Sequence, residues 1–261
     1  MWAGSVWREP TYDRCLVSLS RSGADAVVIR EFDPKTKTFV KDGFALTEAK
    51  SDVVWKDRDT LFVGTDFGPG SLTDSGYPRV AKEWIRATPL ADAKPLYEGK
   101  TTDVGVGAAK DHTQGFEREF VARSISFYES ELFLRRDGKL VKIEKPADAE
   151  ASTHRDLLLI KLRSSWQVGG HLYPAGALLA TDFEEFLKDK RKFDVLFEPT
   201  ERKSLAGFSP TRREHSRRWR VRPQVAPGRT QGEPASGLRR LRGRGPGSRQ
   251  AEGHGAEAPR H

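Results

Sequence analysis

The stretch Leu132-Phe-Leu-Arg-Arg-Asp-Gly-Lys-Leu-Val-Lys-Ile-Glu144 predicts a β-hairpin. Its Asp137-Gly138 pair supplies the two positive φ angles of a type I′ turn, whose twist matches that of antiparallel strands. After the turn, Val141 and Ile143 alternate with charged residues, so the two apolar side chains are expected to share a face. The hairpin sets the pattern that we expect along the rest of the folded chain.

Short apolar runs separated by turn-forming residues predict further strands on both sides of this hairpin. A second hairpin is expected around Lys56-Asp-Arg-Asp59, and a turn at residues 33–37. One short helix is expected at residues 183–188, with Asp182 as its N-cap. The other strands are predicted at residues 15–20, 26–29, 39–40, 53–55, 60–63, 119–127, 156–162, 177–180 and 194–197.

Three similar segments suggest that the strands are organised in a repeat. Ser51-Asp-Val-Val-Trp55, Thr102-Asp-Val-Gly-Val106 and Ser204-Leu-Ala-Gly-Phe208 each open a strand after a polar stretch. A period of ~50 residues with about four strands in each unit is typical of β-propeller blades. The prediction is an all-β fold, an incomplete β-propeller of about four blades of four antiparallel strands. An all-β sandwich is the alternative.

The composition changes abruptly near Pro210. Residues 211–261 hold 13 Arg, no Lys and four acidic residues, whereas residues 1–210 hold 32 basic and 33 acidic residues. The net charge of +8 therefore belongs to the tail, and the preceding part is close to neutral. We predict two regions, a partial propeller at 1–210 and a disordered Arg/Gly/Pro-rich tail at 211–261.

Three origins of this tail are open. It could be an out-of-frame translation of GC-rich DNA, a basic arm that binds nucleic-acid phosphates, or a linker. The sudden loss of Lys and the absence of Asn from the whole chain favour the out-of-frame origin. A nucleic acid is accordingly not expected as a partner.

Long stretches of the chain resemble a known family. Trp55-Lys-Asp-Arg-Asp-Thr-Leu-Phe-Val-Gly-Thr-Asp-Phe-Gly-Pro-Gly-Ser-Leu-Thr-Asp-Ser-Gly-Tyr-Pro-Arg79 closely resembles a segment of bacterial prolyl oligopeptidase-family serine peptidases. Leu16-Val-Ser-Leu-Ser-Arg-Ser-Gly-Ala-Asp25 and Leu196-Phe-Glu-Pro-Thr-Glu-Arg202 do so as well. The likeness extends from about Trp2 to Thr211.

The resemblance implies an N-terminal β-propeller that restricts entry to an α/β-hydrolase domain, which carries a Ser/Asp/His triad and typically cleaves short peptides after proline. It implies the catalytic domain and peptide substrates as partners. The family's Gly-x-Ser-x-Gly elbow is not found here, since Gly68-Pro-Gly-Ser71 has neither its shape nor a following helix. We therefore expect a truncated chain without a catalytic domain, inactive by itself, whose blade edges favour aggregation.

No residue is predicted to be catalytic, cofactor-binding or metal-binding. Asp111-His112 and His154-Arg155-Asp156 are expected to be loop residues with local hydrogen bonds, and Gly105–Lys110 a strand and not a phosphate loop. The only cysteine, Cys15, is expected to be buried near a strand. Residues 64–77 form a long loop that could line a substrate passage.

Aromatic and charged side chains are expected to occupy different places in the fold. Large aromatic side chains are expected to fill the packing between blades, and charged residues to lie on solvated faces. The aromatic residues are Trp55, Trp84, Phe120, Phe127 and Phe133.

No apolar run is long enough to span a membrane, so a soluble protein of the cytoplasm or periplasm is expected. A standalone propeller scaffold and nucleic-acid binding through the tail are the alternative functions.

Overall fold

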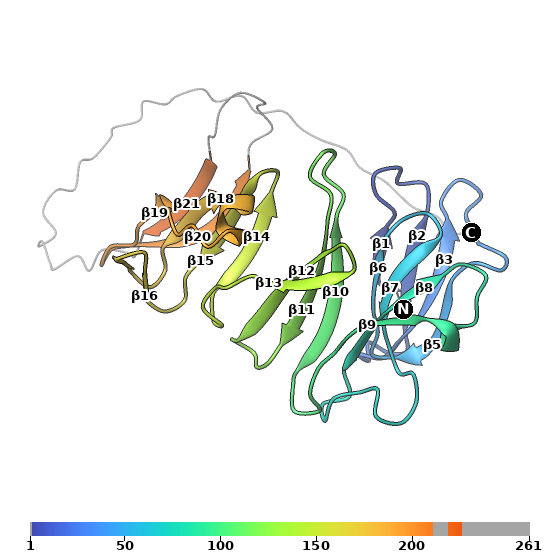
Figure 1. The fold of residues 1–261 in the computed structure, drawn as a ribbon. Coiled ribbons are helices and arrows are strands. Elements are labelled where there is room, and N and C mark those ends of the chain that lie inside the picture. The colour runs from blue at the N-terminus through green and yellow to red at the C-terminus, as the bar shows by residue number, and fades with distance from the viewer. Residues whose placement is uncertain (1, 211–218, 226–261) are drawn as a thin grey trace, which may run out of the picture. The chain divides into compact units, whose positions relative to one another are not determined.

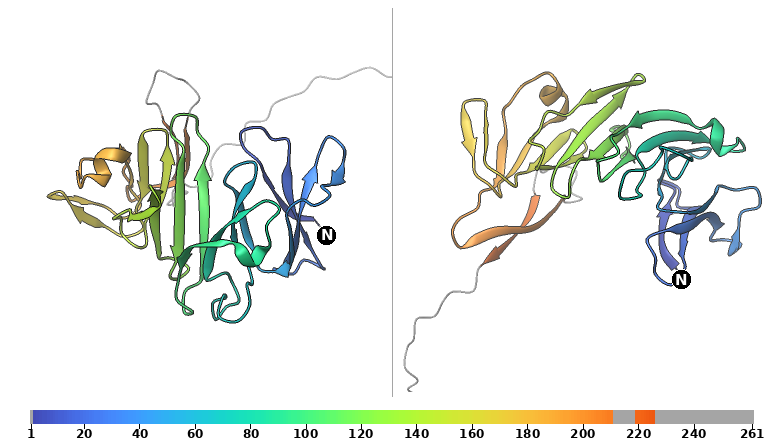
Figure 2. Two further views of the ribbon diagram at one scale, coloured as in Figure 1. Left: turned by 45° about the vertical axis from the view of Figure 1, so that its right-hand side comes forward. Right: turned by 90° about the horizontal axis from the view of Figure 1, so that it is seen from below.

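The computed structural model describes residues 2–210 and 219–225, and its regular structure is almost entirely β-strand (Figure 1). Strands that follow one another in the chain pair antiparallel, so each sheet is built from one continuous part of the sequence. Each sheet accordingly keeps its own range of colour in all views (Figure 2). The all-β prediction is confirmed.

The first sheet has five strands, of which two lie end to end along the same edge of β3. β4 and β5 both pair with β3, β4 at its C-terminal end and β5 at its N-terminal end. Cys15 lies in β2 and is buried, as expected. The strands are β1 (Trp2–Trp7), β2 (Cys15–Ser20), β3 (Val27–Asp33), β4 (Thr38–Phe39) and β5 (Ala45–Ala49).

The second and third sheets are regular four-stranded meanders. A short 3-10 helix, η1 (Leu90–Asp92), precedes the last strand of the second sheet. The second sheet contains β6 (Asp52–Trp55), β7 (Thr60–Gly64), β8 (Val80–Ile85) and β9 (Lys94–Glu98). The third contains β10 (Gly105–Asp111), β11 (Arg118–Ser124), β12 (Ser130–Arg136) and β13 (Lys139–Lys142).

The fourth sheet carries two insertions. Its strands are β14 (Glu150–His154), β15 (Leu157–Lys161), β18 (Leu178–Asp182) and β19 (Asp194–Phe197). A small hairpin, β16 (Trp166–Val168) and β17 (His171–Tyr173), interrupts the path from β15 to β18. Helix α1 (Phe183–Leu187) follows β18, and the Asp182 carboxylate accepts a hydrogen bond from the Glu185 amide at 2.9 Å. The predicted helix and its N-cap are confirmed.

The spacing of the sheets confirms the predicted repeat. The second, third and fourth sheets open at Asp52, Gly105 and Glu150, and a further strand, β20 (Lys203–Pro210), opens at Lys203. Consecutive four-stranded meanders at intervals of ~50 residues are the blades of a β-propeller, here about four of them. A sandwich is excluded, because each sheet packs against the next one along the chain.

The hairpin of the third sheet forms as predicted. Asp137 and Gly138 adopt φ angles of 51° and 74°, and Arg136 pairs with Lys139 across the turn. Of the two apolar residues after the turn, Ile143 is buried whereas Val141 is 41% exposed. That they share a face of the strand stays a prediction. β13 is the outermost strand of its sheet, and Leu140 within it and Ile143 beyond it both pack against buried apolar clusters.

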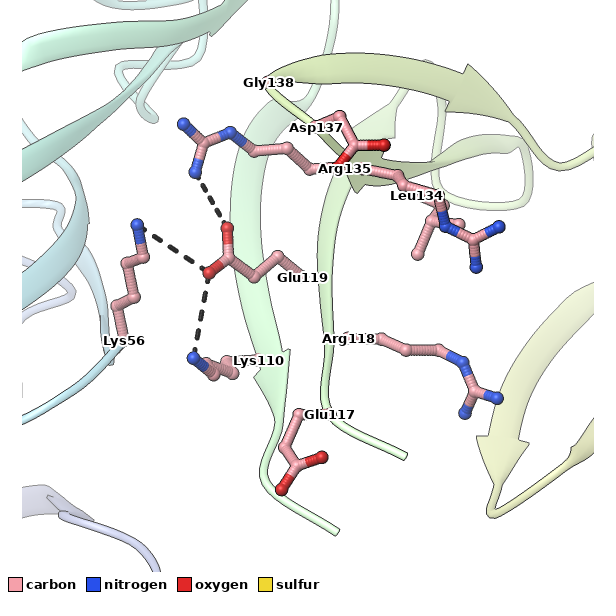
Figure 3. Close-up of a pocket in the computed structure, with 10 residues that line it drawn as sticks. Lys56, Lys110, Glu117, Arg118, Glu119, Leu134, Arg135, Asp137 and Gly138 are labelled. Carbon is pink, nitrogen blue, oxygen red and sulfur yellow. Dashed lines mark hydrogen bonds and ion pairs between the residues drawn. The ribbon is translucent and has the colours of Figure 1, made fainter. Parts of the chain in front are cut away.

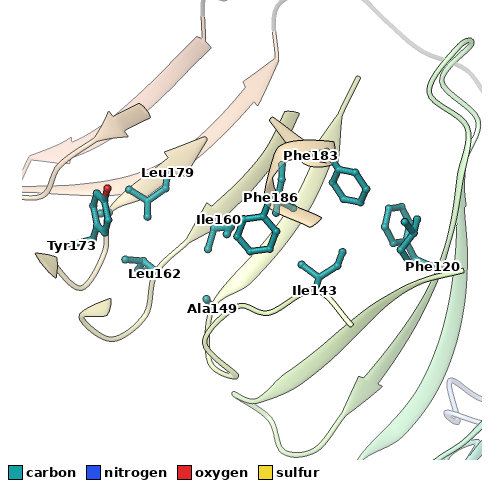
Figure 4. Packing of buried hydrophobic residues seen from close by; sticks show 12 residues of the cluster. Phe120, Ile143, Ala149, Ile160, Leu162, Tyr173, Leu179, Phe183 and Phe186 are labelled. Carbon is teal, nitrogen blue, oxygen red and sulfur yellow. The ribbon is translucent and has the colours of Figure 1, made fainter. Parts of the chain in front are cut away.

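Three clusters of buried apolar residues join successive sheets. The first combines residues of β2, β3, β6 and β7, and the second combines residues of β7, β8, β10 and β11. The third joins β11 and β12 to β15, β18 and α1, with Phe120 and Phe183 in edge-to-face contact (Figure 4). Among the predicted interblade aromatic residues, Phe127 is the exception: it is 90% exposed in the β11–β12 loop.

Buried charges also bind the first sheet to the second. The Glu31 carboxylate is almost fully buried and accepts a hydrogen bond from the Phe44 amide at 3.0 Å. The Arg86 guanidinium, beyond β8, donates to both Glu31 oxygens at 2.8 and 3.1 Å. Two parallel hydrogen bonds from one guanidinium satisfy both oxygens of a carboxylate that is buried away from water.

Part of the predicted disordered tail is described. Residues 219–225 form strand β21 (Trp219–Val225), which pairs antiparallel with β20. Residues 211–218 and 226–261 lie outside the described residues, so the disorder, the origin of the tail and its nucleic-acid binding stay predictions.

Candidate functional site

The loops of the second and third sheets gather at two ends. The loops that follow the first and third strands of a sheet lie at one end, and those that follow the second and fourth strands lie at the other. We call the first the charged end, formed by residues 8–14, 56–59, 86–93, 112–117 and 137–138. The opposite end comprises residues 65–79, 99–104 and 125–129.

A cavity of about 410 Å³ lies at the charged end between the second and third sheets. Glu119 of β11 stands at its centre, and Lys56, Lys110 and Arg135 surround that carboxylate (Figure 3). Arg135 donates to Glu119 Oε2 at 2.8 Å, and both lysine Nζ atoms lie 3.7 Å from Glu119 Oε1. Glu83 of β8 completes the cluster, 2.7 Å from Lys56 Nζ.

A second cavity, of about 790 Å³, adjoins these residues. Lys56, Lys110 and Glu117 line both cavities, and the β1–β2 loop forms another part of the wall. In that loop Arg8 pairs with Asp13. The hydrogen bonds from Arg8 hold the pKa of Asp13 far below its usual value, so this carboxylate stays ionised.

The opposite end is shaped by the long loop at 65–79. The Arg79 guanidinium donates to the carbonyl oxygens of Gly70 and Gly99, at 2.9 and 3.0 Å. Within the loop, the Ser71 hydroxyl donates to the Gly68 carbonyl at 2.6 Å and accepts from the Phe67 amide at 2.9 Å. These contacts fix the loop against the start of the third sheet, and its role in lining a passage stays a prediction.

The expectation that both triad-like segments lie in loops is wrong for Asp111 and His154, which are the last residues of β10 and β14. Arg155 and Asp156 form the turn between β14 and β15, as expected. Gly105–Lys110 lies in strand β10, as expected.

Asp111 accepts hydrogen bonds from the Thr113 amide at 2.9 Å and the Thr153 hydroxyl at 3.0 Å. His112 Nε2 lies 3.0 Å from the Trp55 carbonyl oxygen. These bonds tie β6, β10 and β14 together.

Within residues 2–210 and 219–225, no cluster of His, Cys, Asp and Glu is arranged to hold a metal ion. The same residues include no helix that is long and apolar enough to cross a membrane. That no residue is catalytic, cofactor-binding or metal-binding stays a prediction.

The charged cluster around Glu119 was missed by the sequence reasoning, which placed charged residues on solvated faces. For Lys56, Lys110, Glu83, Glu119 and Arg135 that expectation is wrong, because their side chains are only 18–24% exposed. The positions of the two lysines along the strands could have indicated the cluster, because Lys56 follows β6 directly and Lys110 lies near the end of β10. β6 and β10 are the first strands of their sheets. The blades of a propeller surround a central channel.

The comparison with family models finds no match. Among curated proteins, the chain is similar to the uncharacterized peptidase y4nA of Sinorhizobium fredii, with 33% identity over 213 residues. The match covers 78% of this chain and 29% of the relative, so the chain spans less than a third of that protein.

Solved structures give the same result. A post-proline cleaving enzyme from Rickettsia typhi matches with 28% identity and a TM-score of 0.74, over 80% of this chain and 33% of that enzyme. A prolyl endopeptidase structure shares the fold, with 14% identity, a TM-score of 0.62 and coverage of 80% of this chain and 30% of that one. The chain is therefore similar to members of the prolyl oligopeptidase family, and the similarity corresponds to part of their N-terminal β-propeller.

Proposed function

We propose that the chain serves as the substrate-admitting propeller of a serine peptidase that cleaves short peptides after proline, and that it has no hydrolytic activity by itself. The likeness to the post-proline cleaving enzyme, a TM-score of 0.74 over 80% of the chain, is the observation that carries the proposal. The propeller would limit entry to peptides small enough to reach a hydrolase domain.

The chemistry that peptide hydrolysis requires supports the proposal that the chain is inactive by itself. A nucleophile, a general base and an oxyanion hole must meet in one geometry. Among the described residues, the Ser71 hydroxyl bonds backbone groups of its own loop and His112 bonds the Trp55 carbonyl. Neither side chain is positioned by these contacts to activate the other.

The first test uses the purified 261-residue chain. We expect no hydrolysis of a Gly-Pro reporter amide and no labelling by a fluorophosphonate probe, with the Rickettsia typhi enzyme as the positive control. Covalent labelling of the chain would contradict the proposed lack of activity.

The second test addresses admission of substrate. In a chimera, residues 2–210 replace the matching segment of the Rickettsia typhi enzyme, and a second protein carries only the deletion. We expect the chimera to cleave a short proline-containing peptide but not an unfolded protein. If the chimera and the deletion protein cleave both substrates alike, the admitting role is wrong.

A further inference from the structure

The Lys110 side chain has an unusual environment for a lysine. It is only 19% exposed, yet within the described part of the chain its ammonium forms one ion pair, with Glu119 Oε1 at 3.7 Å. Charge-assisted hydrogen bonds are about 2.7–2.9 Å long, so this contact is an ion pair without a hydrogen bond. Among the described residues, no other side chain or carbonyl accepts a hydrogen bond from Lys110 Nζ.

The other members of the cluster do not supply the missing acceptor. Glu119 Oε1 is shared with Lys56, also at 3.7 Å, while Glu119 Oε2 is taken by Arg135 at 2.8 Å. Glu83 accepts from Lys56 at 2.7 Å and pairs with Arg135 at 3.1 Å. The five-residue cluster thus contains three cations and two carboxylates, an excess of one positive charge.

Both lysines border open space. Lys56 and Lys110 line both the 410 Å³ and the 790 Å³ cavity at the charged end. A cavity of this size accommodates a small ligand or a peptide side chain. Glu117 also lines both cavities, but it is exposed and makes no ion pair with the described residues.

A purely structural role explains Lys56 and Arg135. Each donates a hydrogen bond within its own sheet and forms an ion pair with a carboxylate of the other sheet. A structural role does not explain Lys110, because Glu119 belongs to the strand next to its own and holds it by no hydrogen bond. Ordering a lysine side chain costs rotamer entropy, which an unmade hydrogen bond does not offset. An oxyanion in the cavity would supply the acceptor.

We propose that Lys110 and Lys56 form an oxyanion-binding subsite at the charged end, and that its natural ligand is the carboxylate of a peptide. Lys56 directly follows β6 and Lys110 lies in β10, and these are the first strands of adjacent sheets. That the carboxylate belongs to a peptide on its way to a hydrolase domain rests on the proposed function. Oxyanion binding itself does not.

The experiment measures binding of two probes to the 261-residue chain by calorimetry at constant ionic strength. Inorganic phosphate tests for a general oxyanion site. A proline-containing pentapeptide with a free C-terminal carboxylate, compared with its C-terminal amide, tests for a peptide carboxylate. We expect saturable binding of phosphate and of the free acid, and at least about tenfold weaker binding of the amide.

Two variants separate binding from folding. Lys110→Met should weaken binding of both anions by about tenfold or more, since it removes a charge-assisted hydrogen bond. Lys94→Met, an exposed lysine of β9, removes the same charge and should leave binding unchanged. Glu119→Gln should lower thermal stability but strengthen anion binding, because it removes the carboxylate that competes for both ammoniums.

Each outcome decides the matter. Equal affinities of Lys110→Met and Lys94→Met, or no saturable binding of either probe to the wild-type chain, would overturn the subsite. Weaker binding by Glu119→Gln would assign the cluster to structure alone. Binding of phosphate without binding of the peptide acid would keep the oxyanion subsite and overturn its assignment to peptides, whatever the outcome for the chimera.

Discussion

At the scale of single residues, Asp103 shows how one buried carboxylate organises a loop. It is only 2% exposed and forms two parallel hydrogen bonds with Arg123 of β11, at 2.8 and 2.9 Å. The same carboxylate accepts a hydrogen bond from the Lys100 amide at 2.7 Å. The loop that leads into β10 is therefore fastened to the middle of the third sheet.

This arrangement makes stability depend on pH. The hydrogen bonds from Arg123 hold the pKa of Asp103 below its usual value. A carboxylate with a depressed pKa in the folded state stabilises the fold fully above its unfolded-state pKa of about 4, and the contribution is lost as pH falls through the folded-state value. The wild-type chain should therefore lose stability from about pH 4 downward.

The measurement is the urea midpoint of the wild-type chain and of Asp103→Asn at pH 6 and pH 3. The wild-type chain should be clearly more stable at pH 6, and the difference between the two proteins should shrink at pH 3. A difference that stays constant over this range would mean that the ion pair does not stabilise the fold.

At the scale of elements, local chemistry predicted the structure where a turn or a cap decides it. The Asp137-Gly138 hairpin and the Asp182-capped helix α1 need only a few adjacent residues. The strands missed were β1, β5, β8, β9, β14, β16, β17 and β21. β14 reads Glu-Ala-Ser-Thr-His, which lacks large apolar residues. β9 contains Pro95, which an outermost strand tolerates.

The hairpin turn offers a test of backbone conformation without a change in packing. Gly138 has a φ angle of 74°, and a Cβ added there would meet no atom within 4 Å. Gly138→Ala should therefore cost about 1–2 kcal/mol of unfolding free energy through backbone strain alone. Asp137→Asn is the matched control, because Asn-Gly also suits a type I′ turn. Denaturant unfolding gives both values, and equal stabilities would show that the turn adjusts freely.

At the scale of the whole molecule, burial is distributed between pairs of sheets. The second sheet contributes to two buried clusters, toward the first and the third, and the third sheet also contributes to two. The first and fourth sheets each contribute to one of the three. Stability in such an array is close to a sum of nearest-neighbour interfaces.

We expect amide hydrogen exchange to follow this distribution. Backbone amides of β7, β8, β11 and β12 should exchange more slowly than those of β2, β3, β15 and β18, because their sheets are covered by apolar clusters on both faces. Exchange measured on peptides by mass spectrometry resolves the four sheets. Uniform protection across all four would indicate one cooperative unit instead of separable interfaces.

The charged cluster explains why the candidate site escaped sequence reasoning. Lys56 and Glu119 lie 63 positions apart, and they meet only because two sheets pack side by side. No local sequence pattern indicates a contact between two residues so far apart in the chain. The repeat and the propeller were predictable, since a period of ~50 residues is visible in the chain itself. The register that brings particular charges together was not, because it depends on how the sheets stack.

The single thiol of the molecule has a practical consequence for spectroscopy. Cys15 is buried and burial raises its pKa, so it offers little reactive thiolate to a maleimide at neutral pH. A cysteine introduced at Leu172, which is exposed in the inserted hairpin, would then be the one position that accepts a fluorophore. Energy transfer to a labelled hydrolase could be recorded on a chain that keeps its native core intact.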